Sequence, residues 1–395
     1  MSDPGEVRGR RRVMFVYGTR PEAIKIAPLI VALRAHPALE PVVAVTGQHR
    51  EMLAQAHATF GITPQHDLQL MSPGSSLAQI AATVLVATSE ILRADRPDLV
   101  VVQGDTSSAF AAALAAFYQQ IPLVHLEAGL RTGDIYAPFP EEVNRRLTTP
   151  LAALHLAPTV TSRRNLEAEG IDPATIAVTG NTVIDALYAT LAEPVAYADP
   201  AVARVVAGPR RLLLVTTHRR ESWGDPMAAA MDAVRLVAQQ RPDVHVVLPM
   251  HPNPVVRRLI EPRLGDLDNV LLTEPLRYDE FAHVLRASHV VLTDSGGVQE
   301  EGPSLGKPVL VMRSTTERPE GVHAGTVRLV GTDPQVIVEE TLRLFDDGEA
   351  YAAMAAAINP YGDGKAAQRC AAAIAELLEV GVRMPDFVTG ITRST

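Results

Sequence analysis

The sequence is poor in cysteine and in aromatic residues and carries no excess of positive charge, and each shortage excludes a class of protein. Cys370 is the single cysteine, which excludes an intramolecular disulfide framework and a thiolate metal cluster. Phe, Trp and Tyr make up 4% of the chain, so most of the core must consist of alanine, valine and leucine. The net charge of −9 argues against nucleic acid or an anionic membrane as the main partner, because both require a basic surface.

Long apolar runs are also missing, and no stretch approaches the length that would span a bilayer. An arginine-rich start, residues 8–12, is followed only by a short apolar burst at 13–17. A signal peptide needs a longer apolar stretch and a cleavage site of small residues. We therefore expect a disordered tail before the first strand, no membrane partner and a cytoplasmic protein.

Short β-rich runs alternate with longer helical stretches, which is the pattern of parallel sheets covered by helices. In the first half the expected strands are 13–17, 41–46, 99–103, 123–126 and 176–179. Helices are expected between them at 22–35, 77–94, 106–119 and 141–151. Pro21 suits the first turn of the first helix, where its missing N–H costs nothing.

A second series of the same kind follows a stretch rich in proline and alanine at 193–211. Its expected strands are 212–216, 244–249, 270–273, 290–293 and 309–312, and its helices are 227–240, 254–264, 279–287, 298–305 and 335–345. We predict an α/β fold of two doubly wound Rossmann-like domains, 13–190 and 200–360, with a cleft between them. The last helix, 365–382, is expected to pack back on the first domain.

Ligands of open parallel sheets bind at the carboxyl ends of the strands, so polar residues there are the first candidates. The strongest signal is an apolar strand that runs into Asp294, Ser295, Gly296 and Gly297 at the start of a helix. Backbone N–H groups at such a turn suit a phosphate, and Glu301 one turn later could bind ribose hydroxyls. An ordinary helix N-cap by Asp294 or Ser295 is the alternative.

The first half contains a matching turn in which Arg20 and Lys25 follow the strand at 13–17. Lysine is scarce in this chain, so a lysine one turn from Arg20 favours anion binding, although an exposed helix lysine is the alternative. One such turn is a weak signal. Two of them, one in each half, favour a substrate that carries a diphosphate.

Acidic residues follow two further strands, with Asp105 after 99–103 and Glu127 after 123–126. Glu141 lies in the first turn of the next expected helix. Because charged groups are seldom buried without a partner, these three are candidates for acid–base work. The structural alternatives are an N-cap role for Asp105, an ion pair of Glu127 with Arg131, and a favourable helix-dipole interaction for Glu141.

In the second half, His218 follows a strand beside two arginines, and its proton can exchange near neutral pH. His251 occupies a similar but weaker position. Spacing typical of a metal site is missing: His125 and Glu127 share a strand face, but two ligands without a third are poor support for zinc. The glycine patterns of dinucleotide-binding and Walker loops are missing as well.

A series of motifs in this order resembles the bacterial non-hydrolysing UDP-N-acetylglucosamine 2-epimerases over residues 13–380. The motifs are GTRPEAIK at 18–25, TGQHREM at 46–52, GDT at 104–106, VHLEAGLRT at 124–132, PEE at 140–142, TGNTVID at 179–185, THRRE at 217–221, TDSGGVQEE at 293–301 and TTERPE at 315–320. The resemblance implies a GT-B-like fold whose active site lies between two domains, and a homodimer.

The implied reaction interconverts UDP-GlcNAc and UDP-ManNAc without a cofactor or metal, by elimination of UDP to 2-acetamidoglucal and re-addition. The catalytic roles implied by the resemblance fall on Asp105, Glu127, Glu141 and His218. The implied substrate-binding residues are Arg20, Lys25, Phe281, Ser295, Gly296, Gly297, Glu301 and Arg318. A second, activating UDP-GlcNAc site would use Gln48, Arg50, Arg219, Glu221 and His251.

Three positions depart from the family pattern: Leu276 replaces a polar glutamine, Ser314 an aspartate and Gly302 an alanine. All three bear on the detail of base and sugar recognition and not on the reaction class. Leu276 alone favours a related epimerase that acts on a modified UDP-sugar, or a variant that hydrolyses the intermediate to ManNAc and UDP. A GT-B glycosyltransferase and a non-catalytic UDP-sugar sensor are the remaining alternatives. The presence of all four candidate catalytic residues argues against the sensor.

Overall fold

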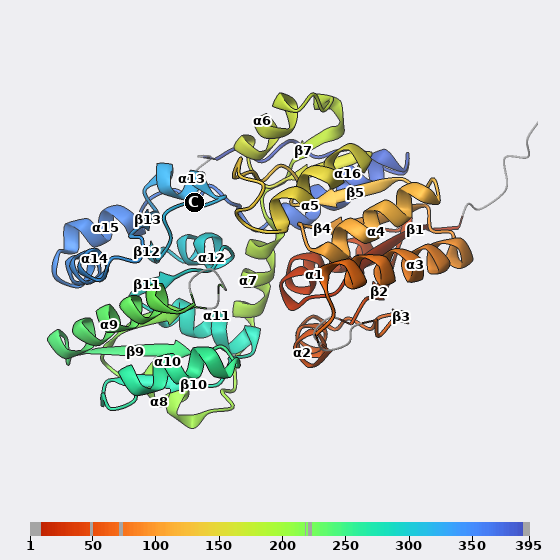
Figure 1. Cartoon of the computed structure of the whole chain (residues 1–395). Coiled ribbons are helices and arrows are strands. Elements are labelled where there is room, and N and C mark those ends of the chain that lie inside the picture. Colours follow the sequence, from red (N-terminus) through yellow and green to blue (C-terminus); the bar gives the residue numbers. More distant parts are fainter. Residues whose placement is uncertain (1–8, 48–49, 71–73, 218, 220–222, 390–395) are drawn as a thin grey trace, which may run out of the picture. The chain divides into compact units, whose positions relative to one another are not determined.

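The computed structural model describes residues 9–47, 50–70, 74–217, 219 and 223–389, and for residues 50–52 the backbone alone. The chain divides into two compact units (Figure 1). The first unit comprises Met1–Ala186 and Gly362–Val388, and the second comprises Leu187–Tyr361 with Thr389–Thr395. Each unit contains its own parallel sheet, so each is described by itself.

The first unit is built on a seven-stranded sheet in which all neighbouring strands are parallel. The strand order is β3 (His66–Asp67), β2 (Leu39–Val45), β1 (Arg11–Tyr17), β4 (Leu99–Gln103), β5 (Leu123–Leu126), β6 (Leu154–Ala157) and β7 (Ile176–Val178). The central strands β1 and β4 are nearly continuous runs of buried apolar residues, as expected for strands covered on both faces. The strand order reverses between β1 and β4, which makes the sheet doubly wound.

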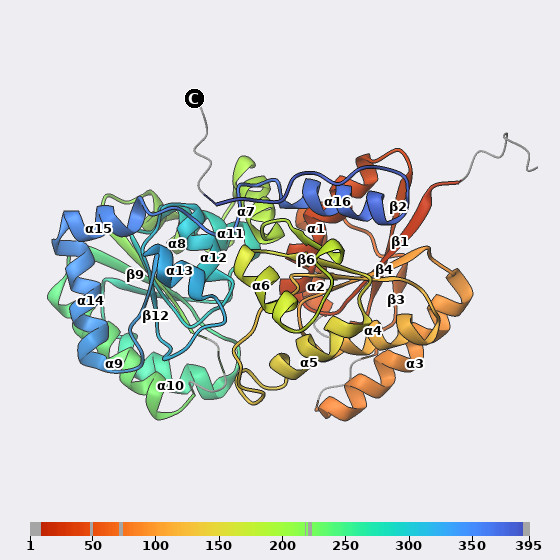
Figure 2. The ribbon, with the colours of Figure 1, turned by 90° about the horizontal axis from the view of Figure 1, so that it is seen from above.

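Helices cover both faces of this sheet (Figure 2). They are α1 (Arg20–Ala35), α2 (Arg50–Phe60), α3 (Leu77–Asp95), α4 (Ser107–Tyr118), α5 (Glu141–Thr148), α6 (Val160–Ala168), the start of α7 (Thr182–Ala192) and α16 (Ala366–Leu377), with 3-10 turns η1 (Thr149–Leu151) and η2 (Pro173–Thr175). Helix α1 begins at a capping box in which Thr19 and Glu22 satisfy backbone N–H groups reciprocally. The alanines of α4 are buried against the sheet, which explains how a chain with few aromatics fills its core.

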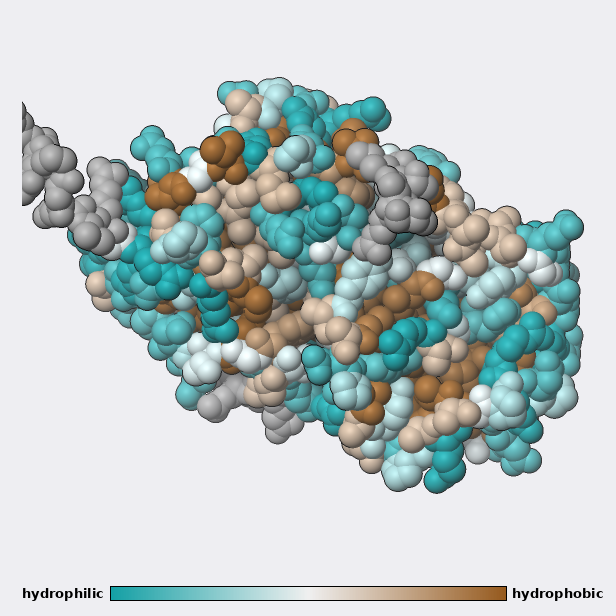
Figure 3. All heavy atoms as spheres, turned by 180° about the vertical axis from the view of Figure 1, so that it is seen from behind, coloured by the Kyte–Doolittle hydropathy of each residue, from teal (hydrophilic) through white to brown (hydrophobic). Residues whose placement is uncertain are grey.

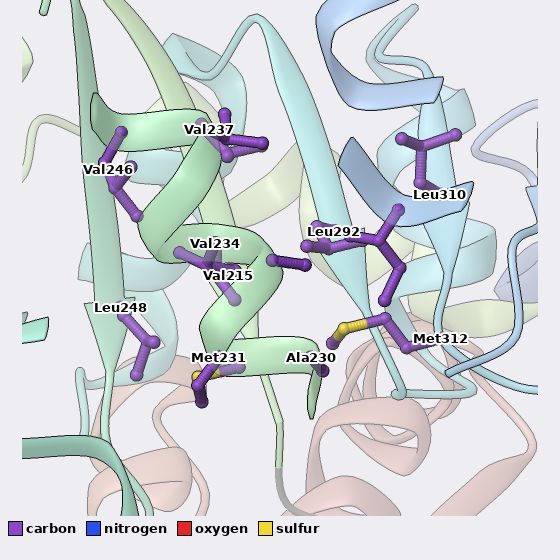
Figure 4. Packing of buried hydrophobic residues seen from close by; sticks show 14 of the residues in the cluster. Val215, Ala230, Met231, Val234, Val237, Val246, Leu248, Leu292, Leu310 and Met312 are labelled. Atoms are coloured by element: carbon purple, nitrogen blue, oxygen red, sulfur yellow. The ribbon is translucent and has the colours of Figure 1, made fainter. Parts of the chain in front are cut away.

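The second unit contains a six-stranded parallel sheet. Its order is β10 (Val270–Thr273), β9 (Val244–Pro249), β8 (Arg211–Thr216), β11 (Val290–Thr293), β12 (Val309–Val311) and β13 (Val327–Leu329). The helices are α8 (Pro200–Ala207), α9 (Asp225–Gln240), α10 (Pro254–Leu264), α11 (Tyr278–Ala287), α12 (Val298–Ser304), α13 (Pro319–Ala324), α14 (Pro334–Asp346) and α15 (Gly348–Ala355). Figure 4 shows Met231 and Val234 of α9 packed against the strands that carry Val215, Val246 and Leu292.

These sheets confirm the predicted α/β class with two doubly wound halves, and they correct several local expectations. The helix expected at 141–151 ends at Thr148, because Pro150 cannot donate the N–H that would continue it. The sequence pattern did not predict the short strands β3, β6 and β13 or the helices α2, α6, α7, α8, α13 and α15. Strand β3 consists of two polar residues, and β6 and β13 each contain a histidine or an arginine, so none of the three is a continuous apolar run.

The C-terminal segment belongs to the first unit. Helix α16 packs against α1 and β6. Beyond the helix, the carboxylate of Asp386 accepts the backbone N–H of Val178 at 3.0 Å, and the N–H of Phe387 donates to the carbonyl of Val178 at 2.7 Å. These contacts bind the segment to the edge strand β7 and shield its free backbone groups.

Helix α3 is, within the described part of the chain, the one helix long and apolar enough to cross a membrane by length and composition. One helix of this kind is weak evidence for a membrane span, because core helices of soluble proteins meet the same criterion. One side of α3 buries Val84, Thr88 and Leu92 and packs along α4. Of the apolar stretch of this helix, only 17% is buried. Apolar side chains also lie among polar ones elsewhere on the surface, as Figure 3 shows for one face.

Candidate functional site

The carboxyl ends of β1, β4 and β5 bring Lys25 and Glu127 together in the first unit. Lys25 Nζ lies 2.5 Å from Glu127 Oε1, and both residues are buried. Glu127 also accepts hydrogen bonds from the side-chain amides of Gln103 and of Asn181, the latter at 2.9 Å. The alternative of an exposed Lys25 is therefore wrong.

The alternative of a Glu127–Arg131 ion pair is wrong as well. Arg131 instead forms a two-pronged ion pair with Glu169, with distances of 2.8 and 2.7 Å. Glu127 itself has a φ of +66°, a left-handed conformation that non-glycine residues seldom adopt and that is often found at functional sites.

Asp105 lies on the turn between β4 and α4. Its Oδ2 accepts two hydrogen bonds from Arg145, from Nε at 3.0 Å and from Nη2 at 2.6 Å. The Asn144 amide donates to the Asp105 carbonyl at 2.9 Å. The N-cap of α4 is Thr106, whose hydroxyl accepts the N–H of Ala109, so the alternative role of Asp105 as N-cap is wrong.

The two neighbouring acids at the start of α5 differ in environment. Glu142 is fully buried and accepts the backbone N–H groups of Thr132 and Gly133 at 3.1 and 3.3 Å, as well as Arg145 Nη1 at 3.2 Å. Glu141 is half-buried. Glu142 therefore stabilises the local structure, and Glu141 stays the candidate for chemistry.

Glu22 connects two turns at the same edge of the sheet. Its carboxylate accepts the N–H of Gly18 at 3.1 Å, the N–H of Thr19 at 2.8 Å and the hydroxyl of Thr106 at 2.8 Å. Burial raises the pKa of Glu22, while these hydrogen bonds oppose the shift. Arg20, a predicted anion-binding residue, is the first residue of α1 beside this contact and is half-buried.

In the second unit, the turn after β11 is held by Asp294. This buried carboxylate accepts the Thr217 hydroxyl at 3.1 Å and the Arg219 backbone N–H at 3.0 Å. The N-cap of α12 is Gly297, and no side chain caps that helix. The alternative of Asp294 or Ser295 as an ordinary N-cap is therefore wrong.

Arg318 is 5% exposed and forms ion pairs with Glu300 and Glu317, each at 2.5 Å. Glu317 also pairs with Arg313 at 3.0 Å and Arg219 at 3.4 Å. Burial alone would raise the pKa of Glu317, but the three guanidinium groups hold it well below its usual range. Arg318 was expected to contact the uridine diphosphate, and no pattern in the sequence indicated this network of ion pairs.

The remaining predicted ligands of the second unit lie close to its core. Glu301 is buried and accepts the Tyr278 hydroxyl at 2.9 Å. Phe281 packs against the core cluster that contains Leu276. Gly302 has a packing reason, because a Cβ there would lie 2.5 Å from Val309 Cγ2.

Several predicted residues fall outside the described part of the chain: His218, Gln48, Glu221 and the side chain of Arg50. His251 is described, and its Nδ1 accepts the N–H of Asn253 at 3.2 Å. Within the described residues, no group of three or more His, Cys, Asp and Glu side chains could hold a metal ion. Asn181, Gln103, Asn144 and Arg145 were not predicted as site residues, although the first follows a strand end and could have been examined on that ground.

The family model described as UDP-N-acetylglucosamine 2-epimerase matches residues 31–375. The chain belongs to the UDP-N-acetylglucosamine 2-epimerase family. It is 48% identical to the UDP-N-acetylglucosamine 2-epimerase of Bacillus subtilis over 382 residues, which cover 96% of this chain and 99% of that relative. The predicted family and the predicted enzyme class, an isomerase, are thereby confirmed.

Solved structures agree with this membership. A putative UDP-N-acetylglucosamine 2-epimerase from Listeria monocytogenes superposes with a TM-score of 0.92 at 49% identity, covering 96% of this chain and all of that one. The Neisseria meningitidis UDP-GlcNAc 2-epimerase bound to UDP-GlcNAc gives 0.87 at 44% identity, covering 93% and 100%. The glycotransferase of kitacinnamycin gives 0.61 at 16% identity over 94% and 98%, a likeness of fold alone that confirms the GT-B-like class.

Proposed function

We propose that the chain interconverts UDP-GlcNAc and UDP-ManNAc, by eliminating UDP to 2-acetamidoglucal and adding it back after the C2 configuration has changed. The two compact units are the two domains of this enzyme. The reaction uses no cofactor and no metal. The observation that carries the proposal is the pair of anchored carboxylates, Asp105 and Glu127, at one edge of the first sheet in a chain of this family. The Neisseria relative that binds UDP-GlcNAc supports the choice of sugar nucleotide.

The chemistry explains why several carboxylates are needed. Removal of the C2 proton requires a base on one face of the sugar, and its return to the opposite face requires an acid. Asp105, Glu127 and Glu141 supply three carboxylates for these two tasks, and His218 is the fourth catalytic residue of the proposal. Arg145 and Lys25 orient the first two through ion pairs.

The departing diphosphate needs cationic or N–H groups that stabilise its charge. We assign this role to Arg20 and to the turn of Ser295, Gly296 and Gly297, and we assign the ribose to Glu301. Lys25, which was expected to bind phosphate, is assigned to Glu127 instead because of the 2.5 Å contact. Arg318 shapes the turn of the second unit through Glu300 and Glu317, since its guanidinium is buried between them.

The proposal is tested by NMR of the purified protein with UDP-GlcNAc in D2O, without NAD or metal. The expected result is a growing UDP-ManNAc signal with deuterium at C2 of both sugars. Free UDP with ManNAc would instead identify a hydrolysing enzyme. Asp105→Asn should lower kcat by orders of magnitude. Asp172→Asn, a change at an exposed aspartate that caps η2, should leave kcat unchanged.

An epimerase for a modified UDP-sugar is the second candidate, and it rested on Leu276. In the structure Leu276 is only 8% exposed and lies in a core cluster with Val284 and Leu285. A buried leucine in contact with two further apolar side chains is explained by packing. The departure therefore gives little support to an altered substrate.

We also propose that the enzyme is a cytoplasmic homodimer, joined through the outward side of α3. The side of α3 opposite the buried Val84 and Thr88 exposes Val86 at 59%, and Leu77 in the first turn of the helix is 45% exposed. Such a face is costly to leave in water, and a second copy of the same face would cover it. Light scattering should give twice the chain mass, and Val86→Arg should shift the protein to monomer. Val31→Arg is the matched control, because the Val31 side chain of α1 is 50% exposed.

A further inference from the structure

The turn that carries Asp105 is held at each of its three residues by a different element. The His125 ring contacts the carbonyl of Gly104 at 2.7 Å from β5, and the Thr106 hydroxyl donates to Glu22 of α1 at 2.8 Å. Helix α5 holds Asp105 between them through Asn144 and Arg145. A turn restrained in this way fixes the position of the Asp105 carboxylate.

The two hydrogen bonds of Arg145 converge on one oxygen of Asp105. Nε at 3.0 Å and Nη2 at 2.6 Å both donate to Oδ2. In the described part of the chain, Oδ1 has no hydrogen-bond partner, and the Asp105 side chain is 24% exposed. The two carboxylate oxygens therefore differ in their hydrogen bonding: Oδ2 accepts both bonds from Arg145, and Oδ1 can accept a proton from a substrate.

The side chain of Arg145 is itself held in place by Glu142. Its side chain is 5% exposed, and its Nη1 donates to Glu142 Oε2 at 3.2 Å. Glu142 is completely buried and bound to the backbone of Thr132 and Gly133. A guanidinium enclosed between two carboxylates is placed to orient Asp105 rather than to receive a diphosphate from solvent.

We propose that Arg145 is a positioning residue that occupies Oδ2 of Asp105 and thereby presents Oδ1 as the oxygen that exchanges a proton with C2 of the sugar. This inference rests on the proposed function. In the elimination direction, a proton passes from C2 to the base, the C2–H electron pair forms the C1=C2 bond, and UDP leaves with the electrons of its bond to C1. In re-addition UDP bonds to C1 while the C1=C2 electron pair takes up a proton at C2, and the configuration changes because this proton comes from an acid on the opposite face of the sugar.

The test replaces Arg145 by lysine, whose ammonium cannot supply the two-pronged fork that Nε and Nη2 provide. We expect kcat to fall about 100-fold, the size of loss that a small misplacement of a reacting group produces. KM for UDP-GlcNAc and the UDP affinity measured by calorimetry should stay within about threefold, since Arg145 does not bind the nucleotide. The kinetic isotope effect with substrate deuterated at C2 should rise, because proton transfer becomes more rate-limiting.

Arg145→Ala supplies a second readout. Added guanidinium should raise the kcat of this variant about tenfold or more, since the small cation can replace the lost guanidinium group. It should not change the kcat of the wild type. Arg163→Lys is the matched control: this arginine of the same unit pairs with Glu167 and Asp386, away from the turn. It should leave kcat and the isotope effect unchanged.

Two results would overturn the inference. The first is an isotope effect equal to that of the wild type, with kcat and the UDP-binding stoichiometry reduced by the same factor. This would show that a smaller fraction of the variant is folded and that the folded fraction is fully active. A fall in UDP affinity with kcat unchanged would make Arg145 a diphosphate ligand. Failure of the wild type to epimerise UDP-GlcNAc would instead contradict the proposed function. The activity of the wild type is therefore measured first.

Discussion

Lys25 and Glu127, 102 residues apart in the sequence, form a buried ion pair with 2.5 Å between Nζ and Oε1. The pair joins the first helix of the unit to the turn after β5. The side-chain amides of Gln103 and Asn181 also donate hydrogen bonds to this carboxylate. This contact places Lys25 beside Glu127, the carboxylate that we propose to be catalytic, and not in the phosphate-binding role that its motif suggests.

Removal of Lys25 should leave a buried charge without its partner. Lys25→Met should lower the free energy of unfolding by about 2–4 kcal/mol, somewhat less than is usual for a broken buried pair, because two amides still donate to Glu127. Turnover should fall by orders of magnitude. Urea unfolding at pH 7 measures the first effect. Lys365→Met, at an exposed lysine of the same unit, should unfold like the wild type, and equal stability of both variants would contradict the prediction.

The sequence was sufficient to predict most strands of both sheets and the positions of the main acids. Strands such as Leu99–Gln103 and Val290–Thr293 are short apolar runs that end in a polar turn, and this local pattern decides their structure. Asp105 and Glu127 could be chosen because each comes directly after such a run. A residue in that position lies at the carboxyl end of its strand, where ligands of parallel sheets bind.

The partners of these acids could not be predicted in the same way. Arg145 lies 40 residues beyond Asp105, on helix α5, and no local pattern relates it to the turn that carries Asp105. The choice between Glu141 and Glu142 depends on which side of α5 faces the backbone of Thr132. Side-chain pairs of this kind are decided by packing in three dimensions, which periodicity along the chain does not contain.

Gly296 and Gly297 are neighbours that should respond differently to alanine. A Cβ at Gly296 would lie 2.7 Å from Arg318 Nη1, and that guanidinium is buried between two carboxylates and cannot move aside easily. A Cβ at Gly297 would meet Glu301 at an ordinary 3.7 Å. Gly296→Ala should therefore cost about 1–3 kcal/mol, or several degrees of melting temperature in the second unit. Gly297→Ala should melt within about 1 °C of the wild type, and the reverse order would disprove the packing argument.

Glu22 should tolerate an amide better than the loss of its side chain. Glutamine has nearly the same shape and keeps an oxygen for the N–H groups of Gly18 and Thr19. Alanine would leave these two donors and the Thr106 hydroxyl without an acceptor, at about 1–3 kcal/mol for each buried group. Glu22→Ala should thus be much less stable than Glu22→Gln in urea unfolding. If both variants lost the same stability, the hydrogen bonds of Glu22 would contribute little.

The stability of the first unit should depend on pH through Asp185. Its carboxylate accepts the N–H groups of Ala367 at 2.9 Å and Ala366 at 3.2 Å, at the start of α16. Burial, the largest cause, raises the pKa of Asp185 from 3.8 to about 6. The folded protein therefore binds this proton more tightly than the unfolded chain does. The resulting stabilisation is complete below pH 3.8 and is lost as the pH rises through about 6.

Asp185→Asn removes this titration while it keeps one acceptor for α16. Between pH 4.5 and pH 7.5 the free energy of unfolding of the wild type should fall by about 1–3 kcal/mol more than that of the variant, since all other groups titrate alike in both. Urea unfolding at the two pH values measures the difference. Asp172→Asn, at an exposed aspartate that caps η2 by the same kind of contact, should keep the wild-type pH dependence. Identical slopes for wild type and Asp185→Asn would mean that the Asp185 proton is bound equally well by the folded and unfolded chain, so that the contact with α16 holds the carboxylate at its ordinary acidity.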